Sequence, residues 1–172
     1  MASVDPTAAR FPGVAQKAGH YESFYLKLCA PGEPLGAWVR YTVHKRPGAL
    51  PTGSLWFTLF GPGAPRAAKI TVAAPQAGDG DWISVGESRI GPGRAEGSIG
   101  SEAAWELRFE SGEPPLFHLP RPWMYTARLP RTKLLSPVPA ARFEGSLVVD
   151  GRELDVDGWE GMVGHNWGVQ HA

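Results

Sequence analysis

Residues 142–159 read RFEGSLVVDGRELDVDGW, and this stretch decides the fold class. Two runs with regularly placed apolar residues, 142–149 and 153–159, are separated by Asp150-Gly151. An Asp-Gly pair between two such runs is a strong signal for a type I′ turn, because both central residues of that turn need positive φ angles. The stretch therefore predicts a tight antiparallel β-hairpin.

The same strand-like alternation extends outward from the hairpin. In residues 104–110, Trp105, Leu107 and Phe109 share one face and charged residues the other, as in a half-buried strand. Clear or weaker versions of the pattern occur in 20–30, 37–44, 55–60, 67–72, 82–90 and 94–100. The 22 glycines and 17 prolines fall mainly between these runs, as turn residues do. About nine strands and no amphipathic helix predict an all-β antiparallel barrel or sandwich.

Two regions lack this alternating pattern of strands and turns. Residues 1–18 have no usable periodicity, so we expect a flexible N-terminal arm followed by one β-barrel domain over residues 19–172. Residues 111–140 hold seven prolines, which remove the donors that an interior strand needs throughout. Because this region also carries Phe117, Trp123 and Tyr125, we interpret it as a long packed crossing over one barrel mouth. The alternative is a partly disordered insertion.

Composition narrows the classes of function. The 172 residues include 17 basic and 17 acidic side chains, so no basic surface points to a nucleic-acid partner. The single cysteine, Cys29, excludes an internal disulfide. The first residues lack the pattern of a signal peptide, and no apolar run is long enough for a transmembrane helix. We therefore expect a soluble, cytoplasmic protein.

The last sixteen residues, 157–172, contain the highest concentration of potentially functional side chains. A histidine such as His165 can donate or accept a proton, and Asp157 and Glu160 are acids close to it in sequence, so these three are the candidate catalytic residues. The alternative is structural: His165 and Asn166 hydrogen-bond strand ends, and the tryptophans belong to the core. His165 and His171 are six residues apart without a further ligand at a usual spacing, so we expect no metal and no cofactor.

Arg40 shares a strand face with Trp38 and Thr42, and the sequence does not decide whether this face points into the barrel or toward solvent. Pointing inward, it would be a buried cation that needs a partner such as Glu22 or Asp157. Pointing outward, it would be an ordinary solvated arginine.

Several blocks of the sequence resemble one known family. They are residues 21–27 (YESFYLK), 37–42 (AWVRYT), 123–125 (WMY), 129–133 (LPRTK) and 158–172, which includes Gly164-His165-Asn166-Trp167-Gly168. Together they are similar to the lipocalin-like two-domain proteins related to carotenoid 1,2-hydratase (hydroxyneurosporene synthase) and to attachment-type homologues. The resemblance implies a calycin-type barrel with an apolar interior. It also implies a second barrel downstream, so we expect this chain to be the N-terminal half of a two-barrel protein, or a half that pairs as a homodimer.

Three functions follow from these observations. The first is a domain that binds an apolar, isoprenoid-like small molecule. The second is a hydratase, isomerase or cyclase that protonates an isoprenoid alkene and stabilises the cation on aromatic faces. The third is a structural half that docks on another barrel. The candidate ligand-binding residues are Trp38, Arg40, Tyr41, Trp123, Tyr125, Trp159, Asn166, Trp167 and His171.

Overall fold

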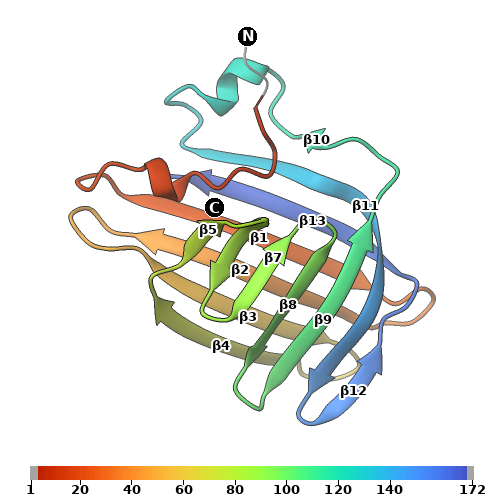
Figure 1. The fold of residues 1–172 in the computed structure, drawn as a ribbon. Coiled ribbons are helices and arrows are strands. Elements are labelled where there is room, and N and C mark those ends of the chain that lie inside the picture. The colour runs from red at the N-terminus through yellow and green to blue at the C-terminus, as the bar shows by residue number, and fades with distance from the viewer. Residues whose placement is uncertain (1–3, 170–172) are drawn as a thin grey trace.

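The computed structural model describes residues 4–169, and all thirteen of its strands belong to one antiparallel sheet (Figure 1). The strands are β1 (His20–Cys29), β2 (Gly36–Lys45), β3 (Thr52–Phe60), β4 (Arg66–Ala73), β5 (Gln76–Gly78), β6 (Asp81–Val85), β7 (Ser88–Gly91), β8 (Arg94–Ile99), β9 (Ala103–Glu110), β10 (Leu116–Phe117), β11 (Thr132–Val149), β12 (Arg152–Asp155) and β13 (Trp159–Gly168). Two short 3-10 helices, η1 (Phe11–Gly13) and η2 (Pro122–Tyr125), complete the elements.

The sheet curls back on itself like a barrel wall. Its strand order is β4-β3-β2-β1-β13-β11-β9-β8-β7-β6-β5, and β10 and β12 both pair with β11. The curl brings β6 against β2 and β3, so the two ends of the strand order face each other across the core (Figure 1). This architecture confirms the predicted all-β, antiparallel, lipocalin-like fold class.

The Asp-Gly hairpin is present as predicted. Val149 of β11 pairs with Arg152 of β12, and the two residues between them, Asp150 and Gly151, have φ angles of 50° and 78°. Positive φ at both positions is the requirement of a type I′ turn. The predicted number of strands was too low for three reasons. Residues 82–90 divide at a turn into β6 and β7, and the short β5 and β10 carry little alternation. The predicted strand 153–159 ends at Asp155, and a separate strand, β13, begins at Trp159.

β11 explains how a proline-rich segment enters the interior of the sheet. It lies between β13 and β9 and contains Pro137 and Pro139. Its pairing with β13 shifts register between Leu135 and Val138 and again between Val138 and Ala141. These irregularities coincide with the two prolines, whose missing N–H groups interrupt a regular ladder. The crossing proper is therefore shorter than residues 111–140: it spans 111–131 and contains β10 and η2.

Packed side chains fill the space inside the curl. Tyr41 is fully buried, and its hydroxyl donates to the carbonyls of Arg89 and Glu96 on the facing strands at 3.0 and 2.8 Å. The indole of Trp105 donates to the same hydroxyl at 2.6 Å and lies 6.0 Å from the Tyr41 ring. The apolar residues that the sequence placed inward therefore pack against one another here rather than lining an open interior.

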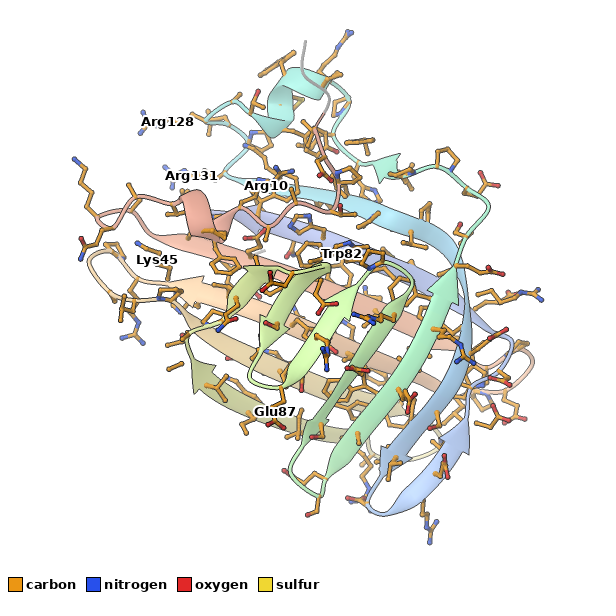
Figure 2. All side chains as sticks on the ribbon, viewed as in Figure 1. Arg10, Lys45, Trp82, Glu87, Arg128 and Arg131 are labelled. Carbon is orange, nitrogen blue, oxygen red and sulfur yellow. The ribbon has the colours of Figure 1, made fainter. Side chains whose placement is uncertain are left out.

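Residues 4–19, which we call the N-terminal segment, lie against the barrel, although the sequence favoured a flexible arm. Phe11 is buried in the main core, and the ammonium of buried Lys45 donates to the carbonyls of Ala15, Gln16 and Ala18. Figure 2 shows Lys45 beside this segment. Across residues 4–169, no helix has the length and apolar character needed to cross a membrane.

Candidate functional site

β13 carries the Gly164–Gly168 signature and divides it between the two faces of the sheet. Because side chains alternate along a strand, His165 and Trp167 point inward with Val163, while Asn166 points outward. β13 pairs with β1 on one side, where His165 faces Phe24 and Trp167 faces Glu22, and with β11 on the other. The site is thus built on the middle strands of the sheet.

A buried carboxylate, Glu22, is the centre of the inward site. Its side chain has no solvent exposure, and it accepts hydrogen bonds from the backbone N–H groups of Arg10 at 2.8 Å and Phe11 at 2.8 Å. His165 Nε2 lies 2.8 Å from Oε1 of Glu22, and His20 Nε2 lies 3.2 Å from Oε2. The N-terminal segment therefore meets the sheet at this carboxylate.

These contacts determine the charge of Glu22. Burial by itself raises the pKa of the carboxyl, but hydrogen bonds from His165 and His20, the attraction of His165 and the Arg10 amide outweigh it and lower the pKa to about 2. A carboxyl with that pKa is ionised at neutral pH.

Both ring nitrogens of His165 face groups that accept hydrogen bonds. Its Nδ1 lies 2.9 Å from the carbonyl oxygen of Pro6, which accepts and never donates. Its Nε2 faces the ionised carboxylate of Glu22, which also accepts. A proton on either ring nitrogen of His165 therefore has a hydrogen-bond acceptor within reach.

Aromatic rings continue from His165 toward the crossing. The His165 ring stacks on Phe24 at 3.9 Å and lies 4.6 Å from Trp167. Trp167 is 6.0 Å from Tyr125, which is 5.3 Å from Phe117 of β10. The guanidinium of Arg10 lies 4.9 Å from the Trp167 ring. Figure 2 shows Arg10 and Trp82 toward the end of the curled sheet from which the crossing rises.

A second group of predicted residues lies on the outer face. Arg40 Nε donates to the Ser23 hydroxyl at 3.0 Å, and that hydroxyl donates in turn to Oδ1 of Asn166. The Arg40 guanidinium lies 5.4 Å from the Tyr21 ring and 5.5 Å from the Trp38 ring. Arg40 therefore points outward and pairs with neither Glu22 nor Asp157, the partners that an inward position would require.

Gly164 and Gly168 of the signature are sites of close approach. A Cβ at Gly164 would lie 2.2 Å from the Tyr25 ring, and a Cβ at Gly168 would lie 2.1 Å from the carbonyl oxygen of Arg131. Any side chain at either position would displace a neighbour.

The structure separates the three candidate catalytic residues. Glu160 is exposed, with its carboxylate 3.8 Å from Arg142, and Asp157 is exposed and accepts from the backbone N–H of Gly145. Neither is placed with buried His165. Tyr41 and Trp159 belong to the core, Trp123 is 55% exposed on η2, and His171 lies outside the described residues.

Glu22 was not among the site residues predicted from the sequence. A signal was present, because Glu22 is in phase with Phe24, Leu26 and Leu28 on the apolar face of the first strand. An acid on an apolar face needs a partner, and here His165 and His20 supply it. Within residues 4–169, no three His, Cys, Asp or Glu side chains are arranged to hold a metal ion.

Comparison with known proteins supports the fold. No protein-family model matches the chain. An uncharacterized protein from two strains of Mycobacterium tuberculosis is 33% identical over 169 residues, a match that covers 96% of this chain and 50% of the relative. The chain thus spans about half the length of the curated relatives it matches.

Two solved structures have a similar fold. An AttH protein of Nitrosomonas europaea has a TM-score of 0.64 at 13% identity, over 99% of this chain and 59% of that chain. Kievitone hydratase from Nectria haematococca has a TM-score of 0.55 at 12% identity, over 91% of this chain and 49% of that chain. These neighbours support a lipocalin-like fold that is related to that of a hydratase.

Proposed function

We propose that this chain is one half of a two-part lipocalin-like protein, and that it binds an apolar, isoprenoid-like small molecule at the junction with the other half. The single observation that carries the proposal is an apolar surface on and beside the crossing. We call it the crossing patch: Leu116, Phe117, Trp123, Leu129 and Leu134. It holds five of the nine large apolar side chains that are exposed among the described residues.

The position of the crossing patch favours a junction. The crossing rises above one end of the curled sheet, next to the N-terminal segment (Figure 1). Phe117 connects it to Trp167 and His165 through Tyr125. Clustered apolar side chains at a surface usually mark an interface or a ligand site. The relatives of this chain are about twice as long, which supplies a partner of suitable size.

We place the proposed ligand site at this end of the barrel because side chains pack the deep core. Tyr41, Trp105 and Phe57 occupy the deep core, where the Phe57 and Trp105 rings stack 6.1 Å apart. A ligand at the crossing patch would bury apolar surface without displacing these side chains. Each 100 Å² of apolar surface removed from water contributes about 2.5 kcal/mol before the costs of association.

A thermal-shift screen tests the proposal with farnesol, geranylgeraniol and oleate. We expect at least one of them to raise the melting temperature, because a ligand that binds the folded state stabilises it. The shift should disappear in a Phe117→Ser, Trp123→Ser double variant. It should remain in Leu50→Ser, which changes a side chain that is 86% exposed in a turn outside the patch. A shift that persists in the double variant would contradict the proposed site.

A second candidate function is hydration or isomerisation of an isoprenoid alkene, and the aromatic surroundings of His165 favour it. His165 lies between Phe24 and Trp167, so a ring that can donate a proton is combined with aromatic faces that stabilise a carbocation. One structural neighbour is named a hydratase. For this function, the segment that supplies Pro6, Arg10 and Phe11 would have to move away from His165.

Isotope incorporation tests this candidate. We expect the protein to add water to an isoprenoid alkene in H₂¹⁸O, and a His165→Gln variant to lose that activity while it stays folded. Equal turnover by the wild type and the variant would exclude His165 as the acid.

A further inference from the structure

A groove of about 600 Å³ lies on the outer face of β2, β3 and β4. Five of its lining residues on these strands alternate with core residues: Thr42 and His44, Ser54 and Trp56, and Lys69. Buried Lys45 of β2 and His20 and Tyr21 of β1 line it as well. The groove reaches the edge of the inward site, because its lining includes His20, whose Nε2 lies 3.2 Å from Oε2 of Glu22, but it does not include His165. It is distinct from the crossing patch, since none of the five patch residues lines it.

A flat aromatic surface forms one wall. Trp56 of β3 lies between Arg40 of β2 and Lys69 of β4 in the strand register. The Lys69 ammonium lies 3.9 Å from the centroid of the Trp56 ring. A ligand ring that stacked on this face of Trp56 would take the place of the ammonium, and the flexible Lys69 side chain would stay within reach of the ligand's negative charge.

The charges of the groove have one sign. Its lining includes His44, Lys45, Arg46 and Lys69 but no Asp or Glu. Lys45 is committed to three backbone carbonyls of the N-terminal segment. Within residues 4–169, Arg46 and Lys69 form no ion pair, so their charges are available to an anion.

A polar side chain at the floor of the groove is an independent sign of a ligand. Thr42 is 5% exposed, and its buried hydroxyl has no hydrogen-bond partner. An unsatisfied buried hydroxyl costs about 1–3 kcal/mol, so such groups call for a specific explanation. Its neighbours in the same cross-strand row are paired: Ser54 with Thr71 at 2.8 Å and Ser23 with Asn166. An acceptor on a molecule bound in the groove would satisfy the Thr42 hydroxyl.

We propose that this groove binds a small organic anion with a flat apolar body, of the class of aromatic carboxylates. The apolar body stacks on Trp56, the carboxylate meets Lys69 and Arg46, and the Thr42 hydroxyl donates to the carboxylate. This site is independent of the apolar ligand proposed at the crossing patch.

Calorimetric titration with 2-naphthoate tests the proposal, with 2-naphthylmethanol as the neutral analogue. We expect saturable binding of the anion, weakened by salt, and at least about tenfold weaker binding of the alcohol, because charge-assisted contacts are the stronger ones. A Lys69→Gln, Arg46→Gln double variant should lose about tenfold in affinity for 2-naphthoate. The control Arg66→Gln removes a cation from the same strand outside the groove and should bind as the wild type does. Equal affinity for the two analogues, or unchanged binding by the double variant, would overturn the proposal.

A Thr42→Val variant separates a ligand role from a structural one. Valine has nearly the same shape and removes the unpaired hydroxyl, so the melting temperature should stay the same or rise. The affinity for 2-naphthoate should nevertheless fall severalfold, since one donor is lost. A variant that is as stable as the wild type and binds 2-naphthoate equally well would contradict the proposed contact.

Discussion

Nε2 of His165 lies 2.8 Å from Oε1 of Glu22, and neither side chain is exposed to solvent. The two residues are 143 positions apart, on neighbouring strands β13 and β1. Each also holds the N-terminal segment: Glu22 through the amides of Arg10 and Phe11, and His165 through the carbonyl of Pro6. The pair therefore joins the first and last strands of the barrel to the segment that covers them.

Replacing Glu22 by glutamine should destabilise the protein strongly. The amide nitrogen of glutamine is a donor, and it would face either the Arg10 and Phe11 amides or the His165 ring, which are donors too. Breaking a buried pair on one side costs about 3–5 kcal/mol. Urea denaturation should show this loss in the free energy of unfolding. The control Glu160→Gln affects an exposed ion pair and should change stability by less than about 1 kcal/mol. Similar losses in the two variants would contradict a central role for the pair.

The contribution of Glu22 should depend on pH in a defined direction. Its pKa falls from 4.5 to about 2 in the folded protein, so the folded state favours the ionised form. The resulting stability is present above the unfolded pKa and is lost as the pH falls through the folded value. The difference in unfolding free energy between the wild type and Glu22→Gln should therefore shrink between about pH 5 and pH 2. A difference that is constant over this range would show that the charge of Glu22 does not matter.

Gly161 should tolerate no side chain. A Cβ there would lie 1.8 Å from the backbone carbonyl oxygen of Lys27 on β1, and a backbone atom in a central strand has little freedom to move. Gly161→Ala should therefore lower the melting temperature markedly or abolish folding. Gly13→Ala is a suitable control, because its Cβ would meet no atom within 4 Å. Equal melting temperatures would contradict the close approach of β13 and β1.

The crossing patch should make the isolated chain self-associate at high concentration. Apolar side chains that are left uncovered favour contact between copies. Sedimentation velocity should show a concentration-dependent dimer for the wild type and a monomer for the Phe117→Ser, Trp123→Ser double variant. A wild type that stays monomeric at every concentration would count against the patch as a docking surface.

Local patterns predicted the fold class well. The Asp150-Gly151 turn and the alternation around Trp105 are decided by neighbours in sequence, and the structure contains both. The course of β11 was harder to predict. Pro137 and Pro139 oppose a regular ladder, and the register shifts that accommodate them arise from pairing with β13, which is distant in sequence.

The candidate site was predicted in part. The signature directed attention to His165 and Asn166, but which face each occupies depends on the register of β13 with β1. Asp157 and Glu160 are near His165 in sequence, yet a surface turn and an outward-facing strand position keep them apart from it. Glu22 comes from the other end of the chain, so sequence proximity gave no reason to pair it with His165.

Direct measurement of apolar ligand binding at the crossing patch tests the central claim. Calorimetric titration with farnesol, geranylgeraniol and oleate should show saturable binding of at least one of them to the wild type and to Leu50→Ser, and no binding of that ligand to the Phe117→Ser, Trp123→Ser double variant. Circular dichroism of the double variant would establish that it retains the native β-structure. Equal binding by the wild type and the folded double variant, or no binding of farnesol, geranylgeraniol or oleate by the wild type, would contradict the claim.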